Sequence, residues 1–213
     1  MIGQLNFNLF GENITTNHDA PESAPRQKRG SVRYYETRDK YLYKRAHSEL
    51  QLLNCINDKP LKDGTSYHFI TSGDVDMMSY LRLVLRTYKK LDYLLFSTWC
   101  MAGEDILYLF DLHRSGVITR MDAYLGEIFK SSYPNEYITI KDMYAEYPIG
   151  RIAFFKNHSK IFAGLSSCGQ GFGIQTSANI NTNPRCEQGN ITIDTGLFEF
   201  YKEYFDGIKS IYE

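Results

Sequence analysis

Residues 154–193 read FFKNHSKIFAGLSSCGQGFGIQTSANINTNPRCEQGNITI. Together with the residues on either side, their pattern predicts strands over 151–162, 173–177 and 189–194. Between the first two strands lies an uncharged run rich in glycine, and such small residues let the backbone approach a ligand closely. The region therefore combines strand-forming segments with a loop suited to a binding site.

Polar side chains recur at a spacing of two within these predicted strands. His158 and Lys160 are expected on one face of a strand, with their Cβ atoms about 7 Å apart. The same spacing puts the hydroxyl of Ser177 beside the amide of Asn179, and both can donate hydrogen bonds to an oxyanion. Glu187 follows shortly after as an acceptor for an imidazole N–H. The set predicts a site for an anionic group.

The rest of the chain predicts an alternation of strands and helices. Strands are expected over 68–72, 91–100 and 117–124, and helices over 75–88, 104–113, 141–147 and 197–212, with Asp74 as the N-cap of the first helix. Such alternation is typical of an α/β sandwich around a mixed sheet.

The combination of His158-x-Lys160, Ser177-x-Asn179 and Glu187 soon after Asn-Pro resembles the phospholipase D superfamily. The resemblance covers roughly residues 65–210 and implies a phospholipase D-like αβα sandwich around a mixed, mainly parallel sheet. It also implies action on phosphodiesters of DNA, RNA or lipids at a site built from two half-sites. This chain holds one His-x-Lys. The resemblance therefore implies a homodimer, like the small bacterial nucleases of the superfamily, with the active site at the two-fold interface.

One position departs from the superfamily pattern, which places an aspartate five residues after the lysine. Leu165 stands there. Branches such as the tyrosyl-DNA phosphodiesterases also lack this aspartate, so its loss does not exclude catalysis. Two hypotheses follow: an active phosphodiesterase, or a dimer whose site has decayed and which binds nucleic acid or serves as a scaffold module.

The expected chemistry also follows from the residue types. Lys160, Asn179 and Ser177 can neutralise and position the oxygens of a phosphodiester, where charge builds in the transition state. The imidazole of His158 can then attack phosphorus, giving a covalent phosphohistidine, and a second His158 can protonate the leaving oxygen. Glu187, by accepting the Nδ1 proton, would fix the tautomer that leaves Nε2 free. This chemistry predicts neither a metal ion nor a small-molecule cofactor.

Length and composition predict one main domain with an N-terminal extension. The chain has 213 residues, 43% of them hydrophobic, which is enough for a sizeable core. Residues 1–45 are expected to be a mobile, basic, tyrosine-rich arm, and residues 46–213 the phospholipase D-like domain. Residues 26–45 hold eight Lys and Arg, two acidic residues and four tyrosines. They fit either a solvated helix face or a surface that tracks phosphates and stacks on bases, so nucleic acid is the favoured substrate over lipid.

Overall charge and cysteine content limit the partners and the cell compartment that can be expected. A net charge of −1 gives no global argument for a nucleic-acid or membrane partner. The N-terminus does not read as a secretory signal, and the uncharged runs are too short or too polar to span a bilayer. The four cysteines are widely spaced, which favours reduced thiols over structural zinc. A cytoplasmic protein without a membrane partner is expected.

Overall fold

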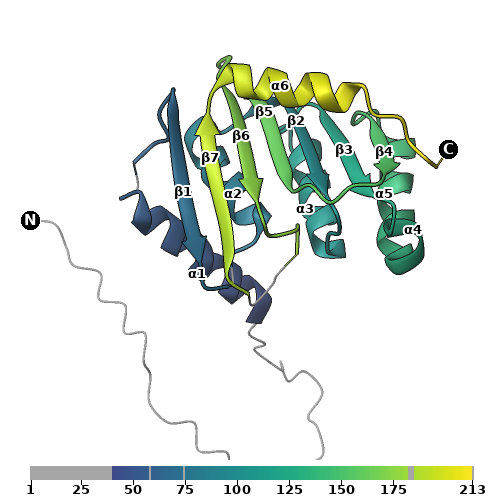
Figure 1. Ribbon diagram of the computed structural model, residues 1–213, viewed down its shortest axis with the longest axis horizontal. Coiled ribbons are helices and arrows are strands. Elements are labelled where there is room, and N and C mark those ends of the chain that lie inside the picture. The colour runs from purple at the N-terminus through teal and green to yellow at the C-terminus, as the bar shows by residue number, and fades with distance from the viewer. Residues whose placement is uncertain (1–39, 58, 74, 182–184, 213) are drawn as a thin grey trace, which may run out of the picture. The chain divides into compact units, whose positions relative to one another are not determined.

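The computed structural model describes residues 40–57, 59–73, 75–181 and 185–212, with side chains from residue 46 onward. These residues form a seven-stranded sheet in the order β1-β7-β6-β5-β2-β3-β4, with helices on both faces (Figure 1). The strands are β1 (Thr65–Thr71), β2 (Leu91–Thr98), β3 (Met121–Gly126), β4 (Ile152–Phe155), β5 (Ile161–Ser166), β6 (Gly171–Thr176) and β7 (Glu187–Ile193). The helices are α1 (Lys40–Cys55), α2 (Met77–Tyr88), α3 (Gly103–Arg114), α4 (Phe129–Ser132), α5 (Pro134–Glu146) and α6 (Thr195–Asp206).

The sheet confirms the predicted class, an αβα sandwich around a mixed sheet. Helix α6 lies across one face, whereas α1, α2, α3 and α5 lie on the other (Figure 1). Strands β2, β3 and β4 are parallel, and the four other neighbouring pairs are antiparallel. The sheet is therefore less parallel than expected, because β5, β6 and β7 follow one another without the crossover helix that parallel neighbours need.

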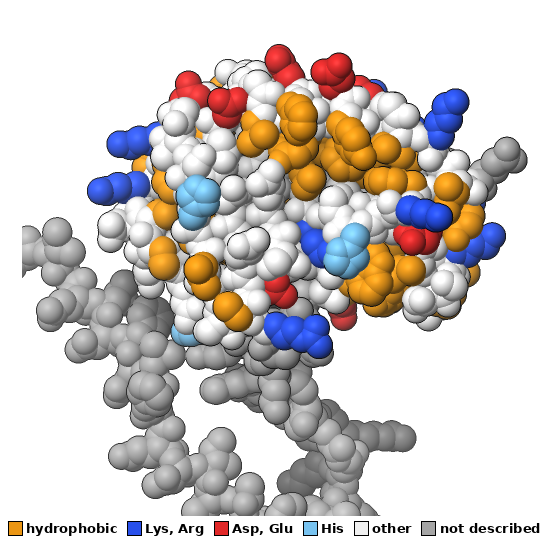
Figure 2. Space-filling model, in the orientation of Figure 1, with side chains coloured by type: hydrophobic (Ala, Val, Ile, Leu, Met, Phe, Trp, Pro, Cys, Tyr) orange, Lys and Arg blue, Asp and Glu red, His pale blue; other side chains and the backbone are white. Residues whose placement is uncertain are grey.

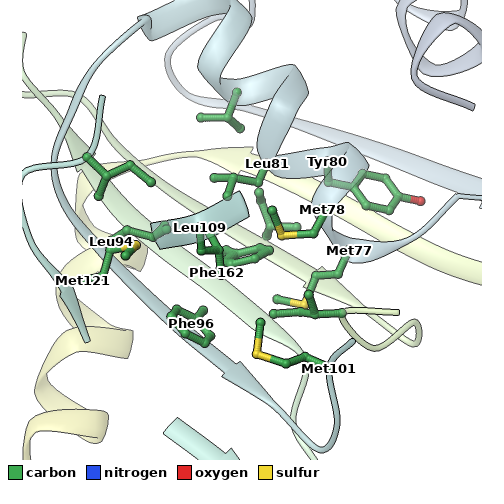
Figure 3. Close-up of a cluster of buried hydrophobic side chains, with 14 of the residues drawn as sticks. Met77, Met78, Tyr80, Leu81, Leu94, Phe96, Met101, Leu109, Met121 and Phe162 are labelled. Carbon is green, nitrogen blue, oxygen red and sulfur yellow. The ribbon is translucent and has the colours of Figure 1, made fainter. Parts of the chain in front are cut away.

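Most of the buried apolar side chains lie between the sheet and helices α2 and α3. Met78 and Leu81 of α2 pack against Phe96 of β2, Phe162 of β5 and Leu109 of α3 (Figure 3). All five are nearly inaccessible to solvent, and burying each such side chain contributes about 1.5–3 kcal/mol. This core fixes β2 and β5 as the central strands of the sheet.

A smaller core lies beneath α6 on the opposite face. Phe198, Tyr201 and Phe205 point inward from the helix and contact Leu95 and Tyr124 of the sheet. The spacing of three, four and seven residues places these three side chains on one side of α6. The helix therefore covers part of this face with one stripe of aromatic rings.

Three helix boundaries differ from the predicted ones. Asp76 caps α2 by accepting a hydrogen bond from the backbone N–H of Ser79, whereas the predicted cap, Asp74, lies outside the described residues. Helix α5 begins at Pro134, well before the predicted residue 141, because proline is well suited to the first helical position. Helix α6 ends at Asp206 and is followed by Gly207, so it is shorter than the predicted 197–212.

The predicted N-terminal arm lies almost entirely outside the described residues. Helix α1 begins at Lys40 and thus runs across the boundary expected at residue 45. All four cysteines are free in the structure. Among the described residues, no helix is both long and apolar enough to cross a membrane.

Candidate active site

The predicted strand over 151–162 is in fact two strands, β4 and β5, joined by a loop of residues 156–160. His158 and Lys160 therefore lie on this loop and not on a strand. The chain leaves the sheet here because Asn157 binds polar groups at the ends of β2 and β3. Its Nδ2 donates to the hydroxyl of Ser97 at 2.9 Å and to the carbonyl of Tyr124, also at 2.9 Å.

The other end of the Asn157 amide holds the loop itself. Its Oδ1 accepts hydrogen bonds from the backbone N–H of Ser159 at 2.9 Å and from the hydroxyl of Ser159 at 2.7 Å. Asn157 is only 5% exposed, so these bonds form away from competing water. The result is a fixed loop with His158 between two anchored residues.

Lys160 and His158 are in contact, although they do not share the face of a strand as predicted. The ammonium Nζ of Lys160 lies 3.1 Å from Nδ1 of His158 and donates to the carbonyl oxygen of His158 at 2.7 Å. Lys160 is 8% exposed, whereas His158 is exposed to solvent. Burial lowers the pKa of Lys160 below its usual 10.5, and the nearby Cys100 and Glu187 oppose this shift. The pair presents an imidazole at the surface with a buried positive charge directly behind it.

Ser177 and Glu187 lie at the adjoining ends of β6 and β7. The hydroxyl of Ser177 donates to Oε2 of Glu187, and the hydroxyl oxygen of Ser177 accepts a hydrogen bond from the backbone N–H of Gln188 at 3.0 Å. Glu187 is buried, and its negative charge favours the charged form of Lys160, which opposes the lowering of the lysine pKa by burial. The sequence predicted a bond from the imidazole of His158 to Glu187. In the structure Ser177 is a partner of this carboxylate, and Nδ1 of His158 contacts Lys160.

Asn179 is connected to the same region through Thr98 at the end of β2. The hydroxyl of Thr98 donates to Oδ1 of Asn179 at 3.4 Å, and the carbonyl oxygen of Thr98 accepts from Nδ2 of Asn157 at 3.3 Å. The backbone N–H of Thr176 donates to the carbonyl of Lys160 at 3.2 Å, which sets the end of β6 beside the start of β5. These contacts bring both predicted motifs, His-x-Lys and Ser-x-Asn, to one edge of the sheet.

Leu165, which stands where the superfamily pattern has an aspartate, lies on β5 opposite Tyr93 and Gly171. Its side chain packs against the core beneath α6. An apolar side chain thus occupies this position, which lies outside the cluster around Lys160.

Sequence reasoning missed the residues that support this cluster. Asn157 anchors the loop, and Ser97 and Thr98 accept hydrogen bonds from its side chain. The ring of Trp99 lies 5.2 Å from the ring of His158. The one signal for them is the change from apolar to polar residues at the end of the run LDYLLFST, where β2 reaches the edge of the sheet.

One solved structure among the comparisons with known proteins supports the fold. No family model matches the sequence, and no curated protein matches it. Among solved structures, the polyphosphate kinase of Porphyromonas gingivalis is similar with a TM-score of 0.51 and 16% identity, over 76% of this chain and 28% of that chain. A yeast tyrosyl-DNA phosphodiesterase gives a TM-score of 0.38 and 8% identity, over 60% of this chain and 31% of that one. The chain thus spans less than a third of the length of either structure.

The topology and the likeness to the polyphosphate kinase define a phospholipase D-like fold. At this level of identity the likeness concerns the fold alone.

Proposed function

We propose that this protein is a metal-independent phosphodiesterase, a nuclease of the phospholipase D type that acts as a homodimer. One observation carries the proposal: the buried ammonium of Lys160 lies 3.1 Å from the imidazole of His158, which is open to solvent. A fixed positive charge behind an exposed nucleophile is the arrangement that an anionic phosphodiester requires, since its charge repels nucleophiles.

Lys160 is the main ligand for the phosphate in this proposal. An ammonium only donates hydrogen bonds, so we infer that Nδ1 of His158 accepts from it in the free protein, which places a ring proton on Nε2. Attack through Nε2 needs the opposite tautomer. Phosphate binding would therefore draw the ammonium from the ring to a non-bridging oxygen, and Asn179 would bind a second oxygen.

The proposed reaction takes two steps. Nε2 of His158 forms a bond to phosphorus as the bond from phosphorus to the leaving oxygen breaks, and His158 of the partner subunit gives that oxygen its proton. A water molecule then attacks phosphorus and passes a proton to the same ring of the partner subunit, while the bond from phosphorus to Nε2 breaks. The products are an alcohol and a phosphomonoester.

Two copies of the chain are needed because each carries one His-x-Lys motif. A two-fold axis through the site would bring two copies of His158 to one phosphate, one as nucleophile and one as acid. The basic, tyrosine-rich residues 26–45 suit nucleic acid, since Lys and Arg pair with phosphates and tyrosine stacks on unpaired bases.

The test is cleavage of single-stranded and duplex DNA and RNA by the full chain in EDTA. We expect cleavage that survives the chelator and is abolished in His158→Asn and Lys160→Ala. His47→Asn, which replaces an exposed histidine of α1, is the matched control and should cleave like the parent. If no substrate is cut by protein shown to be folded and dimeric, the alternative holds, namely a decayed site in a binding or scaffold module. If His158→Asn cleaves like the parent, the site is wrongly assigned.

A further inference from the structure

A hollow of about 370 Å³ adjoins His158 on the face of the molecule that carries α6. One wall is the loop between β4 and β5, including His158 and Ser159, and the other is α6, including Phe200 and Tyr204. Figure 2 shows hydrophobic side chains gathered over α6 on this face. The volume is within the range of sites for small organic groups.

The aromatic residues of this hollow are unusually exposed. Phe200 is 63% exposed and Tyr204 is 61% exposed. The two residues are four positions apart on α6, so they lie on the same side of the helix. The inward stripe of α6 already supplies the core with Phe198 and Tyr201. Phe200 and Tyr204 therefore leave large ring surfaces in water that packing of the domain does not require.

We propose that this hollow binds the base of the nucleotide next to the scissile phosphate, which makes single-stranded nucleic acid the substrate. The inference rests on the function proposed above and specifies its substrate. A phosphate held by Lys160 and attacked by His158 carries its neighbouring nucleoside within reach of the adjoining wall. Every base has a flat π-face, and exposed aromatic rings stack on such faces with little sequence preference.

The remaining lining fits the same occupant. Lys156 also lines the hollow and is exposed, so its ammonium can pair with a flanking phosphate. Bases of a duplex are stacked on one another and paired, so their faces are not available to Phe200 or Tyr204. The hollow therefore selects unpaired strands.

The experiment measures binding separately from cleavage. Full-length protein carrying His158→Asn is titrated into a single-stranded oligonucleotide that holds one 2-aminopurine, and into the same oligonucleotide with an abasic site at that position. Fluorescence of 2-aminopurine measures binding of the strand that carries this base. Anisotropy of an end label measures binding of both the base-bearing and the abasic strand. Phe200→Ala and Tyr204→Ala are compared with Ile138→Ala, which removes an equally exposed apolar side chain from α5.

We expect each aromatic variant to weaken binding of the base-bearing strand by roughly five- to a hundredfold, the effect of losing one stacked base. Binding of the abasic strand should not change, and Ile138→Ala should match the parent. Equal losses for both strands, or no loss, overturn the proposal. So does light scattering that shows the aromatic variants to be monomers where the parent is a dimer, because the rings then form a subunit interface.

The two proposals fail in different ways. Base-dependent binding by a parent protein that cleaves nothing would refute the hydrolytic function and leave the base-binding hollow. Cleavage that depends on His158 but not on Phe200 or Tyr204 would refute the hollow and leave the function.

Discussion

Replacing Asn157 with alanine is expected to damage both stability and activity, because this side chain holds the loop that carries His158. Four of its side-chain hydrogen bonds are 3.0 Å or shorter, two to acceptors at Ser97 and Tyr124 and two from Ser159. A buried hydrogen bond contributes about 1 kcal/mol net, and part of the loss is recovered when water reaches the groups left behind. The free energy of unfolding should therefore fall by about 2–4 kcal/mol.

Urea unfolding of the full chain measures this change, and thermal unfolding should show a drop of roughly 5–15 °C in Tm. The displaced loop should also lower cleavage by about a hundredfold, since a shift of about 1 Å in a catalytic group has that effect. Asn54→Ala on α1 removes an exposed asparagine and should change stability by less than about 0.5 kcal/mol. If Asn157→Ala is as stable as this control, the amide does not hold the loop and the reasoning is wrong.

Three further substitutions test the surroundings of the site. Because burial lowers the pKa of Lys160, this lysine loses its charge at a lower pH than an ordinary lysine, whose pKa is 10.5. Affinity for an oligonucleotide should therefore decline already at a pH below 10.5, and Lys160→Arg should remove that decline. A Cβ at Gly126 would lie 2.8 Å from the carbonyl oxygen of Trp99, so Gly126→Ala should destabilise the fold by about 1–3 kcal/mol in urea unfolding. Leu165→Asp restores the superfamily pattern but puts a carboxylate against the core under α6, where Leu165 is partly buried, so calorimetry should show a loss of about 1–3 kcal/mol, and cleavage should not increase.

Much of the fold could be predicted from sequence because it depends on local periodicity. The spacing of Met78 and Leu81 indicated α2, and the apolar run from Leu91 indicated β2. The break between β4 and β5 could not be predicted, because His158 and Lys160 continue an alternating pattern that fits a strand. The chain leaves the sheet there through bonds from Asn157 to Ser97, 60 residues earlier, and single-sequence patterns do not encode such distant contacts.

The candidate site was likewise predicted only in part from the sequence. The sequence predicted that His158 and Lys160 lie on one face of a strand, and they are close together in the structure, but on a loop. The contact between Ser177 and Glu187 joins the ends of two neighbouring strands, and the sequence predicted both residues but not their bond. Phe200 and Tyr204 fall within the helix predicted over 197–212, and only the position of α6 beside the loop shows that they adjoin His158.

The central claim is that His158 attacks phosphorus, and trapping the covalent intermediate tests it most directly. An oligonucleotide with one radiolabelled internal phosphate is mixed with excess full-length protein in EDTA and quenched with alkaline detergent, in which a phosphohistidine survives. We predict labelled protein at early times, with the label on the peptide that contains His158, and no label in His158→Asn. Cleavage by the parent without labelled protein, or with the label on another residue, would contradict this account.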